Sequence, residues 1–493
     1  MSPTPGTEAR RPRPASSGRP ARQARLDQQT AGLSAAERAA RGKAARDTVP
    51  RQSHAQFEPA RDRPDVVGQL EQQAATRVAD LLPIRYGRML ASAFAYFRGA
   101  ALPMASDLAS TPATGLIVQA CGDAHLANFG IFASPERRLV FDVNDFDETL
   151  PAPWEWDVKR LAASIEVAGQ GNGFSRGQRR AAVLAAVAQY RQAMRRYAGI
   201  GHLDVWYAHV ELDELGAQYQ ALLNAQERKL EAADLARAQD KDGRQALSKL
   251  TRMVDGHAKI VSNPPLVVPL TDLPAAELRG GFEPQLGQII ANYGRTLQSD
   301  RWYLAEHFEV TDIARKVVGV GSVGMRCWII LLVGRDPSDL LLLQLKEADA
   351  SALSAFAGAS GYANQGQRVV AGQQLMQSAS DIFLGWHRTK PGDDQPGADF
   401  YVRQLRDWKF SLVIEGMRPG TMRAYGELCG RALARAHARS GDRIAIAAYL
   451  GGSDVFDQAI ADFAAAYARQ NERDFASLGA AAASGRITAE RGI

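Results

Sequence analysis

Residues 121–143 read CGDAHLANFGIFASPERRLVFDV, and much of the fold can be inferred by working outward from this segment. The apolar GLIVQA before it predicts a short strand, while FGIF and RLVFDV predict the two arms of a hairpin that turns at ASPER. Because the two ends of a hairpin lie side by side, we expect Asn128 and Asp142 to be neighbours, with Asp123 close by. The polar residues of the segment should therefore surround one small space.

The residue types gathered in this segment suit phosphoryl transfer. A carboxylate can accept the proton of an attacking hydroxyl group, and amide and carboxylate oxygens are ligands that Mg²⁺ prefers. Residues 141–148 read FDVNDFDE and place four acidic side chains together, which is costly unless a cation or arginine residues offset the charge. A structural polar turn is the alternative. A metallophosphoesterase, whose pattern also begins with Asp-x-His, is disfavoured because the chain has 8 His and no Gly-Asn-His.

A glycine-rich segment far downstream is a candidate nucleotide cradle. Residues 319–324 read GVGSVG and are followed by the strand patterns CWIILLVG and LLLLQLKEA. A dinucleotide-binding GxGxxG would instead open a helix. A glycine loop followed by a strand, a turn and a strand that carries Lys346 is the protein-kinase arrangement, in which the loop covers the phosphates and the lysine pairs with them. A solvent-exposed lysine at a strand end is the alternative. The candidate nucleotide-binding residues are Gly319, Gly321, Ser322, Gly324 and Lys346.

The segment at 121–128 resembles the catalytic loop of aminoglycoside and choline kinases, the phosphotransferase branch of the protein-kinase-like superfamily. Their pattern is His-Gly-Asp-x-His-x-x-Asn, followed by an Ile-Asp-Phe metal motif and a helix that starts Tyr/Trp-x-Asp-Leu-Ala. Cys121 stands where this pattern has its first His. The matching residues are Gly122, Asp123, His125 and Asn128, then Asp142 at 14 residues after Asn128, then Asp157 in WDVKRLA.

This resemblance implies a role for each matching residue. Asp123 would be the catalytic base, and His125 would brace the loop by hydrogen bonding or take part in catalysis directly. Asn128 and Asp142 would bind Mg²⁺, and Asp145 would assist at the metal. The aspartate at the start of the following helix would be structural and would hold the loop or cap the helix.

One feature of protein kinases is missing from the helix expected after Lys346. Kinases place a glutamate there to pair with the lysine, but residues 365–380 read QGQRVVAGQQLMQSAS and contain no acid. The only acids in residues 347–377 are Glu347 and Asp349. Both lie too close to the strand to take the place of the helix glutamate. Either the lysine pairs elsewhere, or the activity is altered or absent.

Together the motifs predict a helix-rich α+β protein with a protein-kinase-like two-lobe fold. Because the catalytic-loop elements precede the glycine-rich lobe, we expect the fold to be circularly permuted, which proteins tolerate when their termini lie close together. A coincidence between two weak motifs is the alternative. We expect a disordered basic tail over 1–50, a helical lobe with the catalytic loop and metal motif over 51–305, a small β-rich nucleotide-binding lobe over 306–415, and C-terminal helices over 416–493 that pack on the helical lobe.

The body of the chain, about residues 42–475, also resembles the bacterial domain-of-unknown-function family 2252. The resemblance is carried by PIRYGRM, FRGAA, CGDAHLANFG, FDVNDFDETLPAPWEWDVKRLAAS, VVGVGSVGMRCW, FYVRQLRDWK and LARAHARSGD. It supports these boundaries but implies no activity.

Composition sets limits on location and partners. Residues 1–64 carry 13 Lys/Arg against 6 Asp/Glu, so the net charge of +5 comes from the tail rather than from the body. Weak contact between this tail and nucleic acid is conceivable through its arginines, but no aromatic residues accompany them, so we expect no nucleic-acid partner otherwise. No apolar run is long enough to span a membrane, and the N-terminus lacks the apolar core of a secretory signal. Three distant cysteines suggest no disulfide framework, so a cytoplasmic location is expected.

The function that these patterns favour is an ATP- and Mg²⁺-dependent phosphotransferase acting on a hydroxyl group of a small molecule. A nucleotide-binding pseudokinase or scaffold is an alternative, because the helix glutamate is missing. Transfer of a nucleotidyl group, AMP, by the same metal site is another.

Overall fold

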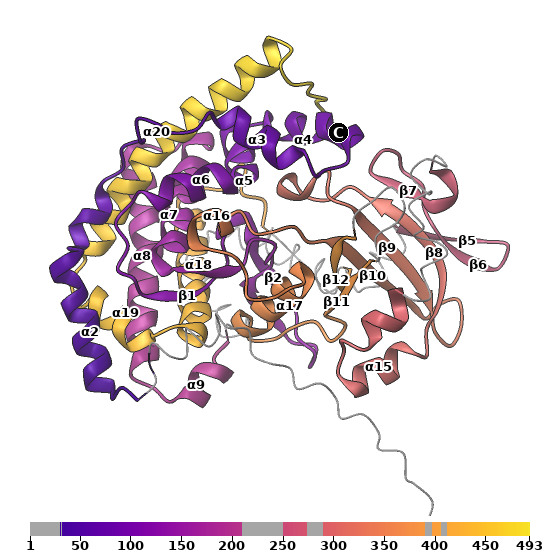
Figure 1. Cartoon of the computed structure of the whole chain (residues 1–493), viewed down its shortest axis with the longest axis horizontal. Helices are drawn as coiled ribbons and strands as arrows, with labels where there is room; N and C mark the ends of the chain where they lie inside the picture. Colours follow the sequence, from indigo (N-terminus) through magenta and orange to yellow (C-terminus); the bar gives the residue numbers. More distant parts are fainter. Residues whose placement is uncertain (1–29, 31, 210–249, 274–288, 390–396, 406–411) are drawn as a thin grey trace, which may run out of the picture.

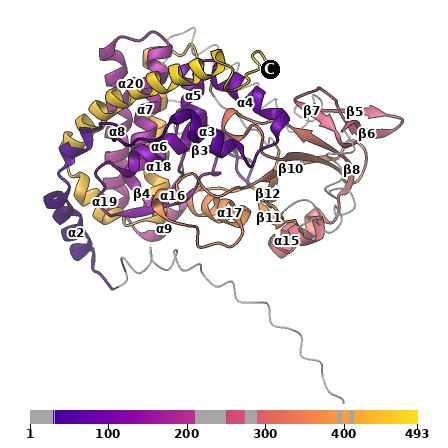
Figure 2. The ribbon, with the colours of Figure 1, turned by 45° about the horizontal axis from the view of Figure 1, so that its top comes forward.

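The computed structural model describes residue 30 and residues 32–209, 250–273, 289–389, 397–405 and 412–493. It is a mixed helix and sheet structure, as the sequence predicts. The helices gather on one side and the largest sheet lies on the other, with α17 (Gln365–Met376) between them in both views (Figures 1 and 2).

Most of the described helices belong to the helical side of the molecule. The first group is α2 (Ala35–Thr48), α3 (Val66–Ala74), α4 (Leu82–Met89), α5 (Ala93–Gly99) and α6 (Ala101–Ala109). The second group is α7 (Trp154–Gly171), α8 (Arg176–Ala198), α9 (His202–Tyr207), α16 (Ser354–Ala357), α18 (Pro419–Ser440), α19 (Arg443–Leu450) and α20 (Val455–Ala483). Helix α15 (Ser299–Ala305) instead lies beside the largest sheet (Figure 1). Short 3₁₀ turns are η1 (Arg51–Ala55), η2 (Ala79–Leu81), η3 (Leu126–Asn128), η4 (Leu270–Asp272) and η5 (Val320–Ser322).

The helical core forms around α7, α8 and α18. Helix α7 is buried along nearly its whole length, and α8 starts with a capping box in which Ser175 and Gln178 bind each other's backbone N–H groups. Helices α8 and α18 approach closely because Gly430 has no side chain, and a Cβ there would lie 2.2 Å from the Ala186 carbonyl oxygen. The long helix α20 runs along the outside of this core (Figure 1).

The N-terminal region is more ordered than its composition predicts. We expected disorder over 1–50, but α2 forms a capped helix whose Ser34 and Glu37 make a capping box. The helix packs on α19, where Arg38 donates to Asp442 at 2.9 Å. The prediction is therefore wrong for residues 35–48, because tertiary contacts stabilise a segment of low intrinsic hydrophobicity. Residues 1–29 lie outside the described part of the chain.

The predicted hairpin is present. Strand β2 (Phe129–Ala133) pairs antiparallel with β3 (Leu139–Val143), with Gly130 opposite Asp142. The Asn144 N–H donates to the Asn128 carbonyl at 2.8 Å, so the two asparagines lie at the mouth of the hairpin. The remaining short strands pair as β1 (Ile117–Ala120) with β4 (Leu150–Pro153), and β5 (Thr251–Val254) with β6 (His257–Ile260).

The largest sheet has six antiparallel strands in the order β11-β12-β10-β9-β8-β7. Alternation of side chains gives the sheet two faces: on β10, Leu341, Leu343 and Leu345 pack into one core, so Lys346 belongs to the other face. The bounds are β7 (Val267–Pro269), β8 (Glu309–Lys316), β9 (Cys327–Val333), β10 (Leu340–Glu347), β11 (Gly385–Arg388) and β12 (Asp399–Gln404).

The sheet also corrects a predicted boundary. We expected the β-rich part to start at residue 306, but β7 already forms the edge strand next to β8. None of the described helices combines the length and apolar character needed to cross a membrane.

Candidate active site

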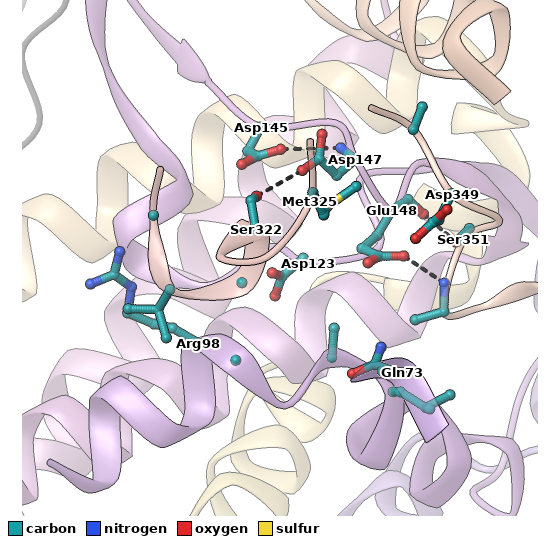
Figure 3. Close-up of a pocket in the computed structure, with 18 of the residues that line it drawn as sticks. Gln73, Arg98, Asp123, Asp145, Asp147, Glu148, Ser322, Met325, Asp349 and Ser351 are labelled. Atoms are coloured by element: carbon teal, nitrogen blue, oxygen red, sulfur yellow. Dashed lines mark hydrogen bonds between the residues drawn. The ribbon is translucent and has the colours of Figure 1, made fainter. Parts of the chain in front are cut away.

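A cavity of about 670 Å³ lies between the helical side and the six-stranded sheet. Its walls come from helices α3 to α6, from the loops on both sides of the β2–β3 hairpin, from the glycine-rich turn between β8 and β9, and from the end of β10. Eight of the predicted site residues line it: Asp123, His125, Asn128, Asp145, Gly319, Gly321, Ser322 and Lys346. Asp142 and Gly324 do not. Figure 3 shows the acidic side chains facing the turn that carries Ser322.

The loop that follows β1 is held in place by Asp157 on α7. The Asp157 carboxylate accepts the backbone N–H groups of Cys121 at 2.7 Å and Gly122 at 2.9 Å. Gly122 adopts a φ of +82°, and a Cβ there would lie 2.3 Å from the Glu148 carbonyl oxygen, so this position requires glycine. Asp157 therefore has the loop-holding contacts that the sequence predicted for it.

Asp123 has the environment of a proton acceptor. Arg160 Nε donates to Asp123 Oδ1 at 2.7 Å, which fixes the carboxylate in the cavity wall. Burial raises the pKa of Asp123 to about 6, although the Arg160 charge opposes this shift. The carboxylate is thus mostly ionised at neutral pH yet basic enough to take a proton.

His125 is buried beside this carboxylate, with Nε2 at 3.6 Å from Asp123 Oδ2. Burial holds the pKa of His125 well below its ordinary value, so the ring is neutral. The backbone around it is tightly turned: the His125 N–H donates to the Asp123 carbonyl, and its own carbonyl accepts the Asn128 N–H, both at 2.8 Å. The contacts through which His125 shapes the loop are thus those of its backbone.

Asn128 and Asp145 bring two side-chain oxygen donors to the cavity. Asn128 Nδ2 donates to the Asp123 carbonyl at 2.7 Å, which leaves the amide oxygen as the ligand atom. Asp145 Oδ1 accepts the Asp147 N–H at 3.1 Å and lines the same cavity. No group of three or more His, Cys, Asp or Glu side chains in the described chain forms a ready metal cluster. A Mg²⁺ ion held by one carboxylate, one amide and substrate phosphates needs no such cluster.

Asp142 occupies a different environment from the one expected. Its carboxylate is buried and accepts Arg435 Nη2 at 2.5 and 2.6 Å, together with the Ser378 N–H at 3.1 Å. Asp142 is not placed to bind a metal in the cavity, because its carboxylate does not line the cavity and its charge is already neutralised by Arg435. The strand pairing explains the error, since the chain turns into the cavity only after β3 ends at Val143.

Lys346 is paired with an acid that the sequence reasoning did not single out. Its ammonium group forms an ion pair with Asp147, which also accepts the hydroxyl groups of Tyr401 at 2.9 Å and Ser322 at 3.1 Å. Burial alone would raise the pKa of Asp147, but Lys346 lowers it below its ordinary value. The lysine thus pairs elsewhere than on the helix behind it. The acid run at 141–148 was the signal that could have pointed to this residue.

The glycine-rich turn is positioned by the helical side. Arg77 Nη1 donates to the Val323 carbonyl, and the Val78 N–H donates to the Gly324 carbonyl at 2.8 Å. Gly324 has a φ of +89° and lies against the Arg77 side chain, which is why it does not face the cavity. Gly319 and Gly321 do line it, with open space where a Cβ of Gly319 would project.

Glu148 adds to the negative charge of the cavity. Its carboxylate accepts the Ala352 N–H at 2.5 Å, and burial raises its pKa to about 7. Asp349 also lines the cavity, and burial raises its pKa as well. The acidic lining residues of the cavity are matched in number by basic ones, so charges of both signs gather there: Asp123, Asp145, Asp147, Glu148 and Asp349 against Arg77, Arg85, Arg98, Lys346 and Arg403.

A second cavity of about 660 Å³ adjoins the first. The two share Asn144, Val318, Gly319 and Arg403. The second is lined by the end of β12 through Gln404 and Leu405 and by apolar groups such as Phe383. These apolar side chains suit a flat, partly apolar ligand group.

Comparison with known protein families gives one match. The model of a family described as "Uncharacterized protein conserved in bacteria (DUF2252)" matches residues 77–481. The chain belongs to this family. This match confirms the DUF2252 membership predicted from the sequence. The matched region includes the residues that line the first cavity from Arg77 onward. Searches of curated proteins and of solved structures each found no match. The resemblance to aminoglycoside and choline kinases therefore rests on the sequence motifs alone.

Proposed function

We propose that this DUF2252 protein is an ATP- and Mg²⁺-dependent phosphotransferase that phosphorylates a hydroxyl group of a small molecule. The observation that carries the proposal is the contact between two motifs far apart in the chain. Lys346, on the strand pair that follows the glycine-rich turn, is ion-paired with Asp147 of the acidic segment. Two independent halves of a kinase-type site thus meet in one cavity.

The nucleotide is proposed to span the two cavities. The base would lie in the second cavity beside Gln404 and Leu405, and the phosphates would lie under Gly319 and Gly321 in the first. A glycine-rich turn between antiparallel strands, with a lysine on the next strand, is the arrangement that protein kinases use to hold nucleotide phosphates. We further propose a two-lobe kinase-like fold in circularly permuted order, because the sheet follows the catalytic loop in the chain.

The catalytic step is assigned to Asp123. The acceptor hydroxyl oxygen attacks the γ-phosphorus, the bond from that phosphorus to the β,γ-bridging oxygen breaks, and ADP leaves with the electron pair. The acceptor proton passes to Asp123, whose pKa of about 6 leaves it ionised at neutral pH. Arg160 keeps the carboxylate oriented throughout.

The donor set fits a Mg²⁺ ion. Asn128 and Asp145 would hold it, and the ion would neutralise charge on the transferring phosphoryl group. The support for a cation there is the chemistry of these two side chains, an amide and a carboxylate that both line the cavity.

A nucleotide-binding pseudokinase is the second candidate. It is favoured by the helix behind Lys346, where α17 presents Arg368 rather than an acid. Arg368 donates to the carbonyl groups of Asp147, Thr149 and Asp349, each at 2.8 Å. Its contacts are thus structural, and they leave the lysine with Asp147 as its charge partner.

Radiolabelled ATP separates these functions. The protein is incubated with Mg²⁺ and a panel of small hydroxyl compounds, with ATP labelled on either the γ- or the α-phosphorus. Label transferred from the γ-position, and abolished by Asp123→Asn, supports the phosphotransferase. Label transferred only from the α-position would replace the proposal with nucleotidyl transfer, and Mg²⁺-dependent binding without any transfer, including to water, would replace it with the pseudokinase.

A further inference from the structure

Three arginine side chains in the wall of the first cavity, Arg77, Arg85 and Arg98, have buried donors that nothing in the described chain accepts. Arg85 on α4 is fully buried, and its Nη2 donates to Gln73 Oε1 at 3.2 Å. Its Nε and Nη1 have no hydrogen-bond partner among the described residues. Arg77 is half-buried, and its Nε is likewise buried without a partner in the described structure.

Such a state is unusual for a buried guanidinium. Arginine donors in protein interiors are normally satisfied by carboxylates or carbonyl groups, because an unsatisfied buried donor costs free energy. Four acidic groups lie within electrostatic range of Arg77, namely Asp349, Glu148, Asp147 and Glu347. Among the described contacts none of them accepts a hydrogen bond from it. Burial and the neighbouring Arg77 charge lower the pKa of Arg85 to about 9, so an anion placed here would gain from both charges.

The position of Arg77 and Arg85 distinguishes them from the nucleotide end of the site. A third cavity of about 820 Å³ adjoins the first on another side, and the two share Thr76, Arg77, Met325 and the segment 348–350. It shares no lining residue with the second cavity. The first cavity therefore lies between the other two. Neither Arg77 nor Arg85 lines the second cavity, where the base is proposed to bind.

The acceptor would approach from the third cavity. The arginines Arg326 and Arg388 on its rim are already paired, with Glu347 at 2.7 Å and with Asp399 at 2.5 Å. Arg77 forms no such ion pair in the described structure, and it lies where the third cavity meets the first. Figure 3 shows Gln73, the partner of Arg85, on the wall below Asp123 and Glu148.

We propose that Arg77 and Arg85 form an anion subsite, and that the acceptor substrate carries a phosphate or carboxylate group that binds there. The assignment of the bound anion to the acceptor substrate rests on the proposed phosphotransferase function, whereas the anion subsite itself does not. A guanidinium fork matches the oxygens of either group, and the unmet donors on Arg85 would then be satisfied. The acceptor hydroxyl would lie toward Asp123, away from the anchored end.

Titration of the full chain with inorganic phosphate tests the subsite. Heat of binding is measured for the natural protein, for Arg77→Gln and for Arg85→Gln, each with and without ATP and Mg²⁺. We expect saturable binding, weakened about 10- to 100-fold in either variant, because a hydrogen bond to a charged group is lost. ATP affinity should stay within about twofold in Arg85→Gln, because this side chain does not line the base cavity. Arg77→Gln should weaken ATP as well, because Arg77 holds the Val323 carbonyl of the glycine-rich turn. Acetate, titrated in parallel, distinguishes a carboxylate-binding from a phosphate-binding subsite.

Arg423→Gln is the matched control, because Arg423 is an exposed arginine on α18 whose ion-pair partner among the described residues is Glu427, at 3.4 Å. It removes one charge away from the three cavities and should leave phosphate affinity unchanged. If Arg85→Gln fails to fold, Arg77→Gln alone decides, since Arg77 is half-buried.

Two results would overturn the subsite. One is phosphate binding that is absent or equally strong in the arginine variants while ATP still binds, which leaves the phosphotransferase proposal standing. The other is mutual competition between phosphate and ATP, with both weakened by Arg85→Gln, which would assign the arginines to the nucleotide. Phosphate binding lost in the variants, in a protein that does not bind ATP, would support the anion subsite and remove only the proposed function.

Discussion

The end of strand β3 and the loop that follows it carry carboxylates of the same kind in opposite situations. Asp142 is buried in an ion pair with Arg435 and does not line the cavity. Asp145 and Asp147, three and five residues later, both line the cavity, where Lys346 pairs with Asp147 and further acids and arginines gather. The closed pair is out of reach of a ligand, whereas the open cluster can contact one. The charge partner, rather than the acidity of the run, separates a structural carboxylate from a candidate site residue.

The largest effect should come from breaking the closed pair. Asp142→Asn leaves Arg435 buried without its counter-charge, which we expect to lower the free energy of unfolding by about 3–5 kcal/mol. Urea denaturation followed by circular dichroism measures this. The double variant Asp142→Asn/Arg435→Leu should recover much of the loss, because no unpaired charge then remains. A stable Asp142→Asn protein that has lost its response to Mg²⁺ would restore Asp142 as a metal ligand.

A smaller and different effect is expected at the open cluster. Asp145→Asn should change the stability of the unliganded protein by less than about 1 kcal/mol, because this side chain has no buried ion pair to lose. At ATP and Mg²⁺ concentrations near 100 times the dissociation constant, the natural protein should gain about 2.7 kcal/mol and the variant almost none. Thermal unfolding with and without the ligand reports both numbers. Removing Mg²⁺ with EDTA should reproduce the variant in the natural protein, and an equal gain in both proteins would exclude Asp145 from metal binding.

The third prediction concerns pH. Because burial raises the pKa of Asp123 to about 6, this carboxylate is protonated and unable to accept a proton below that pH. We expect kcat/KM for γ-phosphate transfer to rise as pH increases through about 6, and to be about tenfold below its plateau at one unit under the pKa, equivalent to about 1.4 kcal/mol. Glu148, with its pKa near 7, could produce a similar limb. In the variant Glu148→Gln, kcat/KM should therefore still rise through about pH 6. Loss of this rise in the variant would assign the role of base to Glu148.

The smallest effect is expected from Tyr401→Phe. This change removes one of three groups that hydrogen-bond to Asp147, while Lys346 and Ser322 remain, so we expect a loss of about 0.5–1.5 kcal/mol in unfolding free energy. Urea denaturation of Tyr401→Phe and Asp142→Asn under the same conditions compares the two losses of unfolding free energy directly. A loss as large as that of Asp142→Asn would mean that Asp147 belongs to a closed network, and the contrast between the two regions would then fail.

Local patterns in the sequence were enough to predict the parts of the site. The hairpin, the glycine-rich turn and the strand with Lys346 all follow from periodicity and turn residues, and each forms within a short stretch of chain. The resemblance to the kinase pattern implied that Asp157 holds the loop or caps its helix, and the structure shows the loop contacts.

Partners from distant segments could not be predicted. Asp142 meets Arg435 and Lys346 meets Asp147 across separations of 293 and 199 residues, and only tertiary packing selects these pairs. The same holds for α2, whose polar composition is typical of disorder until α19 covers it. The spacing from Asn128 selected Asp142 over Asp145 because spacing cannot show which way a strand turns its side chains.

The Arg77 side chain holds the Val323 carbonyl of the glycine-rich turn and also lines the opposite end of the cavity. A movement of that turn on nucleotide binding would therefore displace the Arg77 side chain. An anion bound to Arg77 would in turn stabilise the position of the turn. Occupancy of either end is thus expected to change affinity at the other by the same factor, as thermodynamic linkage requires. In a steady-state experiment with both substrates varied, this coupling would make the Michaelis constant of each substrate depend on the concentration of its companion.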